Sequence, residues 1–255
     1  MLELKNISSG YGKKEVLSDI SVNFEAGKLI SVIGPNGSGK STLLKTALGF
    51  IEPFSGDILL DRVSVLQEKR GEIAKKIAYL PQGKNLPCMT VEQLVLHGRF
   101  PHLSYPRRYS QKDYLIANEA IKQMGLCGFE KMPLASLSGG MRQKVYIAMC
   151  IAQDTDYILL DEPATYLDIA HSLELMKLLK DLAKSGKCVI AVMHDLTLAL
   201  NFSDELLLLN EGKKVADCSA EKLVKTEYIK QIFGVGISYL PEQNGYFYDY
   251  SINLP

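Results

Sequence analysis

Apolar and polar residues follow two different periods along this chain. Where every second residue is apolar, as in Ile20-Ser21-Val22-Asn23-Phe24, the pattern predicts a strand with one buried and one exposed face. Short, nearly continuous apolar runs such as Leu29–Ile33 predict strands that are buried on both faces. The segments that carry one of these signals are Glu3–Ile7, Leu17–Phe24, Leu29–Ile33, Asp57–Leu60, Ile77–Leu80, Tyr157–Leu160, Cys188–Met193, Glu205–Leu209 and Lys214–Cys218.

A helical period replaces the strand pattern from about Val91 to Ile151, where β-branched runs are lacking. Further helices are expected over Leu43–Leu48, Ala170–Lys184 and Ala220–Phe233, before a final hairpin-like pair. Strands that alternate with helices predict an α/β fold with a largely parallel sheet, and the 91–151 stretch predicts a helical insertion. The alternating tyrosines at the end are interpreted as packing residues: Tyr246, Tyr248 and Tyr250. The helical stretch is interrupted at Pro101, Pro106, Gly125, Gly128 and Pro133.

Composition narrows the class of protein. The chain has 255 residues, 47% apolar content and 29 basic against 29 acidic side chains, so it lacks the basic excess that is typical of nucleic-acid binders. We therefore expect no nucleic-acid partner. No apolar run is long enough for a membrane helix, and the first residues do not resemble a signal peptide. The five scattered cysteines predict reduced thiols and no metal site.

The strongest chemical signal follows the strand Leu29–Ile33 and precedes the helix Leu43–Leu48. It fits the phosphate-loop pattern G-x-x-x-x-G-K-[ST] in the strand–loop–helix setting that the pattern requires. Glycines let backbone N–H groups turn toward an anion, and the helix N-terminus adds partial positive charge. Lys40 is expected to reach the outer phosphates and Ser41 to bind Mg²⁺. The predicted ATP-binding residues are Gly34, Pro35, Asn36, Gly37, Ser38, Gly39, Lys40, Ser41 and Thr42.

A second signal is the apolar strand Tyr157–Leu160, which ends in two carboxylates. Asp161 is expected to hold Mg²⁺, and Glu162 to polarise the water that attacks the nucleotide. An apolar strand that ends in Asp-Glu is common by itself, but the upstream phosphate loop makes the functional interpretation the better one. The carboxyl ends of the two strands are expected to lie at one edge of the sheet, where ligands bind in such folds.

A third signal, Leu137–Gln143, combines a hydroxyl, two glycines and a helix start. This is a second device that can bind an anion. An ordinary helix start with Ser138 as N-cap is the alternative interpretation. One bound nucleotide per isolated chain does not explain two such devices.

These motifs together resemble the ATP-binding subunits of the ABC transporter superfamily, and the resemblance covers nearly the whole chain. Leu137–Gln143 resembles the LSGGQ signature, with Met141 in place of the commoner Gln or Glu. The resemblance implies a P-loop NTPase core with a mixed sheet, an inserted α-helical subdomain and an antiparallel β subdomain. It implies one domain over 1–255, with a core of 1–82 and 157–255 and a helical subdomain of about 83–156. It also implies a head-to-tail homodimer whose signature residues cap ATP across the interface: Ser138, Gly139, Gly140 and Met141.

The resemblance assigns roles to further residues. Tyr11 matches the aromatic that stacks on adenine, and Gln82 matches the glutamine that contacts Mg²⁺ and water. His194 matches the switch histidine at the γ-phosphate. Asp168 lies in the segment Ala164–Asp168, which matches the D-loop at the dimer interface. The implied catalytic set is Glu162, His194, Gln82 and Lys40, and the implied Mg²⁺ ligands are Ser41, Gln82 and Asp161.

Two stretches indicate which ABC protein this is. His97–His102 and Thr165–His171 resemble segments of the ATPases of iron-chelate and cobalamin importers. This implies a polytopic permease as partner, a substrate-binding protein acting indirectly, and a peripheral location at the cytoplasmic face of the membrane. Residues from Gln82 to His102 are expected to line the groove for the permease. For Arg99–His102 the alternative is a simple turn between helices.

Three other functions compete with this interpretation. They are a soluble ABC ATPase acting on DNA or ribosomes, another P-loop enzyme such as a small-molecule kinase, and the ATPase of an exporter or another importer class. The sequence has neither tandem cassettes nor basic patches, and a kinase needs no second phosphate cap. The ATPase of an exporter or another importer class is therefore the runner-up. The sequence does not identify the cargo, so ferric siderophore, haem and cobalamin remain open.

Overall fold

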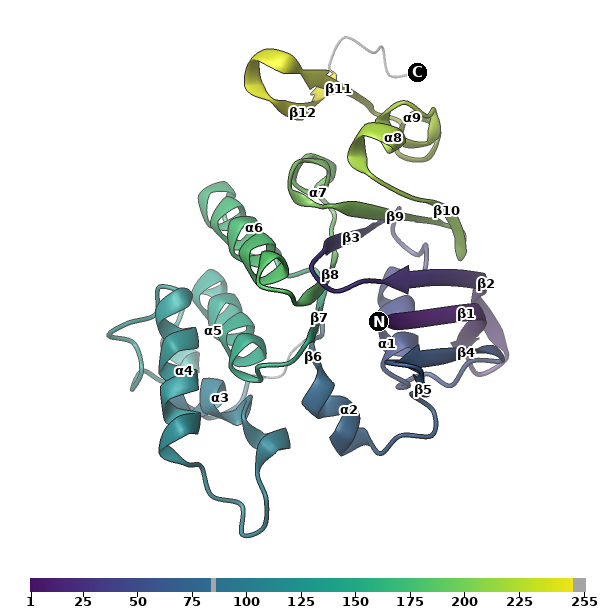
Figure 1. The fold of residues 1–255 in the computed structure, drawn as a ribbon. Coiled ribbons are helices and arrows are strands. Elements are labelled where there is room, and N and C mark those ends of the chain that lie inside the picture. Colours follow the sequence, from purple (N-terminus) through teal and green to yellow (C-terminus); the bar gives the residue numbers. More distant parts are fainter. Residues whose placement is uncertain (84–85, 250–255) are drawn as a thin grey trace. The chain divides into compact units, whose positions relative to one another are not determined.

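The computed structural model of the protein describes residues 1–83 and 86–249. These residues form two compact units, which are described separately below. Unit 1 comprises residues 1–68 and 176–255, and unit 2 comprises residues 69–175. Figure 1 shows the elements of both units in chain colours. The predicted α/β class is confirmed, because strands and helices alternate along both units.

Unit 1 begins with an antiparallel sheet in the strand order β2-β1-β4-β5 (Figure 1). Strand β1 contributes Leu2, Leu4 and Ile7, whose side chains have almost no exposed surface, but its burial does not alternate strictly because its register shifts between Leu4 and Ile7. Helix α1 packs against this sheet, where the hydroxyls of Ser9 and Thr46 lie 2.9 Å apart. The elements are β1 (Leu2–Tyr11), β2 (Lys14–Phe24), β4 (Ser55–Leu60), β5 (Val63–Ser64) and α1 (Lys40–Ala47).

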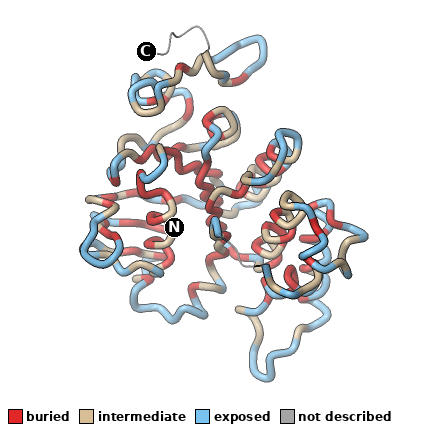
Figure 2. Tube along the Cα trace, turned by 180° about the vertical axis from the view of Figure 1, so that it is seen from behind, coloured by how far each residue is buried: buried red, intermediate tan, exposed pale blue. Residues whose placement is uncertain are grey.

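A second group of strands in unit 1 has the order β10-β9-β3-β8. The strands β9, β3 and β8 are parallel, whereas β10 is antiparallel to β9, so this sheet is mixed. All five residues of β3 and of β8 are buried, which is why their sequences read as continuous apolar runs (Figure 2). The bounds are β3 (Leu29–Ile33), β8 (Cys188–Val192), β9 (Glu205–Asn210), β10 (Lys213–Cys218), α7 (Leu196–Phe202) and, crossing from residue 169 of unit 2 into unit 1, α6 (Ile169–Lys184).

The C-terminal part of unit 1 corrects one prediction. The expected helix Ala220–Phe233 is two helices, because the Thr226 backbone N–H and hydroxyl both donate to the Leu223 carbonyl and end the first helix there. The final hairpin is present, and the rings of Tyr239 and Tyr246 pack 5.1 Å apart between centroids. Tyr250 lies outside the described residues. The elements are α8 (Ala220–Val224), α9 (Tyr228–Phe233), β11 (Gly236–Leu240), η3 (Pro241–Gln243) and β12 (Gly245–Asp249).

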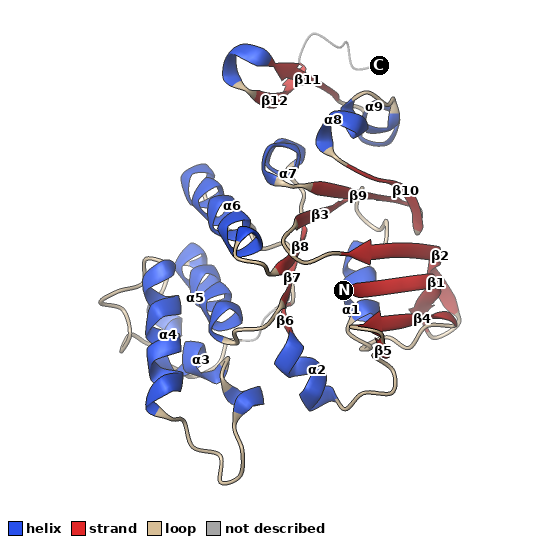
Figure 3. Ribbon diagram, in the orientation of Figure 1, coloured by secondary structure: helices blue, strands red, loops and turns tan. Residues whose placement is uncertain are grey.

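Unit 2 combines a parallel strand pair with a group of helices, shown in blue in Figure 3. Residues 91–151 contain helices and no strand, so the predicted helical stretch is confirmed. Helices α3, α4 and α5 pack against one another. The elements are α2 (Arg70–Lys76), β6 (Ile77–Leu80), α3 (Val91–His97), η1 (Phe100–His102), α4 (Gln111–Gln123), η2 (Leu134–Ser136), α5 (Gly139–Ala152) and β7 (Tyr157–Asp161).

An ion pair is buried among the helices of unit 2. Arg99 Nε donates to Asp113 Oδ1 at 3.1 Å, and the two residues are 6% and 8% exposed. Burial alone would raise the pKa of the Asp113 carboxyl, but hydrogen bonds from Ser110 and Arg99 outweigh it and lower the pKa. Arg99 therefore lies inside the unit, and its side chain is not part of a surface groove.

The lowered pKa of Asp113 predicts how stability responds to acid. A carboxyl with a depressed folded pKa contributes stability above its unfolded pKa of about 3.9, and that contribution is lost as pH falls through the folded value. We expect an Asp113→Asn variant to lose less stability than the wild type between about pH 5 and pH 2. Urea denaturation of both proteins over this pH range measures the free energy of unfolding. Equal pH dependence of the two proteins would contradict the prediction.

Candidate functional site

The predicted phosphate loop connects β3 to α1 and is packed tightly on both sides. A Cβ on Gly34 would lie 2.2 Å from the Leu209 carbonyl oxygen, and a Cβ on Gly39 would lie 2.5 Å from Leu17 Cδ2. The Gly212 amide also donates to the Ser38 carbonyl at 3.3 Å. The loop is thus held between β2 and the turn that joins β9 to β10. At Gly34 a side chain would collide with backbone, and at Gly39 a side chain would meet both an unfavourable positive φ of 99° and the Leu17 side chain.

The interior of this loop suits an anion. Lys40 is 6% exposed, and its ammonium donates to the carbonyls of Gly34 and Pro35 at 2.8 Å each. The Ser38 hydroxyl is buried and has no hydrogen-bond partner in the described part of the chain. No side chain caps the N-terminus of α1, where Gly39 is the N-cap residue. A triphosphate fits this arrangement, since it would accept from the Ser38 hydroxyl and from the N–H groups that a helix start leaves unpaired.

Two glycines of the loop give a matched test of this packing. Gly39 and Gly37 both have positive φ angles, 99° and 81°, but a Cβ on Gly37 would meet nothing within 4 Å. Backbone strain of about 1–2 kcal/mol is common to both alanine variants, and displacement of Leu17 is added only at Gly39. We expect Gly39→Ala to lower stability and ATP affinity more than Gly37→Ala, measured by thermal unfolding and nucleotide titration. Equal effects would show that the contact with Leu17 is unimportant.

Two further predicted residues lie in unit 1. Tyr11 ends β1 and is 51% exposed, so its ring is available for stacking. His194 is exposed and follows β8, which pairs in parallel with β3, so it lies at the same sheet edge as the phosphate loop. Asp195 caps α7 by accepting from the amides of Thr197 and Leu198 at 2.8 and 3.1 Å. The cap fixes the backbone next to His194.

In unit 2, the parallel strands β6 and β7 bring three predicted residues to one edge. Leu80 pairs with Leu160, so Gln82 and the carboxylates Asp161 and Glu162 all follow the carboxyl ends of adjacent strands. Asp161 is 1% exposed. Glu162 has a φ of 55°, a left-handed conformation that is rare and strained outside glycine. Strain of this kind is common at functional sites, and here it follows directly after a buried strand.

The predicted signature begins α5. Ser138 is the N-cap residue, and its hydroxyl accepts from the Met141 amide at 3.2 Å, so this serine caps the helix. Gly139 and Gly140 pack against Tyr166: a Cβ on Gly140 would lie 3.1 Å from the Tyr166 carbonyl oxygen. Gln143 Nε2 donates to the Pro163 carbonyl at 2.7 Å. The start of α5 and the segment 163–166 are therefore one packed substructure.

Asp168 is the last residue of the predicted D-loop Ala164–Asp168 and directly precedes α6. Its carboxylate lies 2.8 Å from the His171 amide and 2.9 Å from His171 Nδ1. These hydrogen bonds, the backbone one foremost, lower the pKa of Asp168. Tyr166, two residues earlier, is 77% exposed. The predicted D-loop thus presents an ionised carboxylate and an exposed ring to the surroundings.

A cavity of about 520 Å³ opens next to these segments in unit 2. Gln82 lines it, together with Gly139 of α5 and the exposed Tyr166. Helix α5 also contributes Arg142, Gln143 and Tyr146 to the lining of the cavity. Unit 2 therefore brings Gln82 and the signature helix to the wall of one cavity.

Sequence reasoning missed some residues of the second unit. Asp113, which pairs with Arg99, had a local signal, because Ser110-x-x-Asp113 is a capping-box pattern and the structure forms that box. Gln153 had none: its side chain donates to the carbonyls of Ala74 and Ile77, more than seventy residues earlier in the chain. The five cysteines are free, as predicted. In the described ranges no three acidic, His or Cys side chains form a ready cation site, and no helix has the length and apolar character needed to cross a membrane.

Comparison with known proteins agrees with this geometry. A family model described as ABC transporter matches residues 17–165, which is more than half of the chain. The chain is 40% identical over 239 residues to the petrobactin import ATP-binding protein YclP of Bacillus subtilis (strain 168), covering 93% of this chain and 94% of that protein. It is 38% identical over 236 residues to the iron(3+)-hydroxamate import ATP-binding protein FhuC of the same strain, covering 92% of this chain and 88% of the relative.

Solved structures show the same fold. A proposed metal-chelate type ABC transporter in an inward-facing conformation matches with a TM-score of 0.82 and 27% identity, covering 98% of this chain and 97% of that chain. The dimeric structure of MJ0796, a bacterial ABC transporter cassette, matches with a TM-score of 0.77 and 29% identity, covering 86% and 99%. The P-loop NTPase core predicted from sequence is thereby confirmed. This chain belongs to the ABC transporter family, as one of its ATP-binding, ATP-hydrolysing subunits.

Proposed function

We propose that this protein hydrolyses ATP to energise the import of an iron chelate through a membrane permease. The observation that carries the proposal is the similarity, over more than nine-tenths of the chain, to two ATP-binding proteins named for import of different siderophores. A siderophore is therefore the favoured cargo, and haem and cobalamin are the other members of the proposed class. The alternative function is the ATPase of another ABC importer or of an exporter.

The proposed site residues divide the chemistry among themselves. Lys40 and the loop amides would bind the phosphates, Tyr11 would stack on adenine, and His194 would contact the γ-phosphate. Glu162 would accept a proton from the attacking water, which Gln82 orients. The donor set Ser41, Gln82 and Asp161 consists of oxygen groups that suit Mg²⁺, and the bound ion would neutralise charge on the phosphates.

The proposed assembly is a homodimer in which Ser138, Gly139, Gly140 and Met141 cap ATP held by the partner's phosphate loop, with Asp168 at the interface. The solved dimeric cassette supports this, since a second chain explains two anion-binding devices in one sequence. The two chains would associate tightly with ATP bound and less tightly after hydrolysis. This difference in affinity between the two states would drive transport. The domain proposal remains a single ATP-binding domain over 1–255, with its core at 1–82 and 157–255.

The proposed location is the cytoplasmic face of the membrane, where the chain binds a polytopic permease. A substrate-binding protein would deliver cargo to that permease. Exposed residues of unit 2 between Gln82 and His102 would provide part of the permease surface, whereas buried ones such as Arg99 and Val95 would not.

Affinity purification tests the partner directly. Tagged Glu162→Gln protein is recovered from solubilised native membranes with Mg-ATP, and its companions are identified by mass spectrometry. We expect a polytopic permease. The matched control is the Glu162→Gln protein without nucleotide, which should not be held in the closed, ATP-bound form.

The cargo is tested by uptake. Cells that lack this chain should take up less ⁵⁵Fe-loaded hydroxamate or catecholate siderophore, and the wild-type chain but not Lys40→Met should restore uptake. In the affinity purification, recovery of ribosomal or DNA-repair proteins without a permease would contradict the transport role. Normal uptake of every iron chelate, haem and cobalamin by the deletion strain would favour the alternative function.

A further inference from the structure

The end of helix α5 opposite to its signature residues is held by hydrogen bonds from Arg99, His102 and Gln153, which together are called the clamp. The helix starts at the N-cap Ser138 and ends with Ala152 and the C-cap Gln153. The last carbonyls of a helix have no partner within it and need donors from elsewhere. Here the donors are side chains of the segment Arg99–His102, which the sequence singled out and which the chemistry of ATP does not explain.

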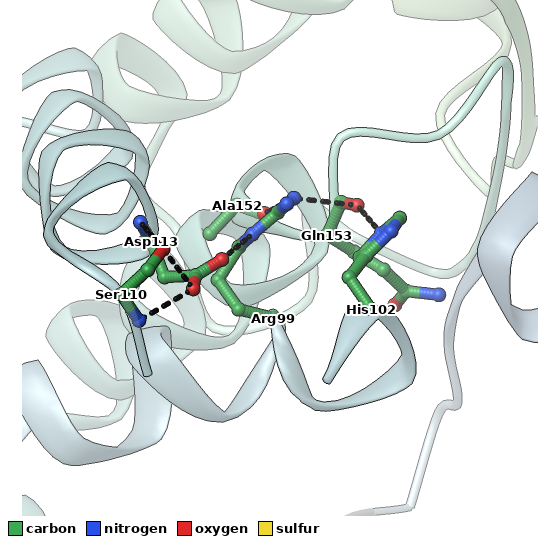
Figure 4. A network of polar contacts seen from close by, with 6 residues as sticks. All are labelled: Arg99, His102, Ser110, Asp113, Ala152 and Gln153. Atoms are coloured by element: carbon green, nitrogen blue, oxygen red, sulfur yellow. Dashed lines mark hydrogen bonds and ion pairs between the residues drawn. The ribbon is translucent and has the colours of Figure 1, made fainter. Parts of the chain in front are cut away.

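Arg99 supplies the main contacts of this clamp (Figure 4). Its Nη1 donates to the Ala152 carbonyl at 2.9 Å and to the Gln153 carbonyl at 3.1 Å. His102 Nε2 lies 2.7 Å from the same Gln153 oxygen. Because a carbonyl only accepts, that nitrogen must carry the proton and donate. A cationic guanidinium at a helix C-terminus also complements the negative end of the helix dipole.

Asp113 and Ser110 hold the guanidinium in place. Asp113 Oδ1 accepts from Arg99 Nε, while Oδ2 accepts from the Ser110 amide at 2.8 Å and from its hydroxyl at 2.7 Å. Both oxygens of a buried carboxylate are thus used (Figure 4). The planar, forked guanidinium joins Asp113 and two helix carbonyls at once, which a lysine ammonium does not do in the same geometry.

Gln153 extends the clamp to the strand that leads to Gln82. Its Nε2 donates to the Ala74 carbonyl at 2.6 Å and to the Ile77 carbonyl at 3.0 Å, at the start of β6. The backbone carbonyl of this residue accepts from Arg99 and His102, and its side chain donates to the end of α2 and the start of β6. The end of α5 and the beginning of β6 are therefore joined through one residue.

We propose that Arg99 is a positioning residue for ATP turnover: it fixes the far end of α5 to β6, so that the signature at the start of α5 and Gln82 after β6 keep one geometry. A helix of 14 residues is about 21 Å long, so Arg99 acts through the helix and does not touch the nucleotide. The proposal rests on the proposed function, because the roles of Ser138 and Gln82 do.

The test separates positioning from loss of stability. In Arg99→Met with Asp113→Asn both buried charges are removed together, so no uncompensated charge is left, and the asparagine oxygen can still accept from Ser110. Arg99→Lys keeps the charge without the fork. Gln153→Leu removes only the bonds to Ala74 of α2 and Ile77 of β6. The control Val95→Ala opens a cavity in α3 without touching the clamp. Each full-length variant is assayed for folded fraction, ATP Kd, ATPase kcat and amide hydrogen exchange.

We expect all three clamp variants to retain ATP Kd within about twofold and to lose roughly 10- to 100-fold in kcat, the range for displaced catalytic geometry. Faster exchange is expected at amides 139–143 and 149–153. Val95→Ala should lose kcat only in proportion to its folded fraction. The proposal would be overturned if Arg99→Lys kept the wild-type kcat. It would also be overturned if the kcat of the double variant fell only in proportion to its folded fraction. If the wild type hydrolysed no ATP, the proposed function would fail, whereas unchanged exchange at both ends of α5 would refute the clamp.

Discussion

Replacing Glu162 by glutamine is expected to leave ATP affinity nearly unchanged and to lower turnover by about 100-fold or more, the usual contribution of a general base. Glutamine has almost the same shape but does not accept a proton from water. The residue follows β7 with a φ of 55°, and its carboxylate lies 3.4 Å from the Thr165 hydroxyl, so the backbone already fixes where its side chain begins. Loss of turnover without loss of binding should also accumulate the ATP-bound dimer.

Phosphate release and size-exclusion chromatography with Mg-ATP measure these two effects. The matched control is Glu119→Gln, which changes an exposed carboxylate on α4 outside the proposed site and should behave as wild type. Phosphate release at the wild-type rate by Glu162→Gln would show that another group activates the water. A monomeric variant with low turnover would instead contradict the role of ATP in holding two chains together.

Replacing Lys40 by methionine is expected to cause the second large effect, a loss of ATP affinity. Its ammonium stands within the phosphate loop, and charge-assisted hydrogen bonds of this kind are worth about 1.5–3 kcal/mol, so ATP affinity should fall by roughly 10- to 150-fold. The same change removes the donor to the Gly34 and Pro35 carbonyls, which adds a moderate loss of stability. Equilibrium titration with a fluorescent ATP analogue and thermal unfolding measure the two effects separately.

Lys45→Met is the control, because Lys45 lies on the same helix α1, in its last turn. It removes one positive charge from the same element without emptying the loop. If both variants lost affinity equally, the effect would be one of general charge, and the specific role of Lys40 would be refuted. If Lys45→Met keeps a much higher ATP affinity than Lys40→Met, the result supports the loop as the phosphate site.

The strand limits show how far local sequence patterns reach. The buried runs at β3, β6 and β7 were predicted to within one residue, because burial of nearly every position favours apolar side chains along each strand. The helix Ala220–Phe233 was predicted wrongly as continuous. Its apolar period continues through the break, but the Thr226 hydroxyl takes the carbonyl that the next helical turn would need.

The candidate chemistry was also local in origin. The phosphate loop, the paired carboxylates after β7 and the signature serine are each contiguous motifs, since one turn of backbone has to surround one anion or end one strand. Arg99 shows the opposite case. Its motif suggested a surface segment or a turn, yet its guanidinium is buried and holds carbonyls 53 and 54 residues away.

The sequence by itself thus determined the α/β class and most of the strands, and it supplied the groups that are proposed to bind ATP. The reason is that apolar periodicity and short motifs act within one element or one turn. Only the tertiary structure decided which strand ends are neighbours, that Ser38 keeps a buried hydroxyl without a partner in the described residues, and that Gln153 joins α5 to β6. These depend on contacts between residues far apart in the chain, and hydrogen-bond geometry at such distances leaves no pattern in a single sequence.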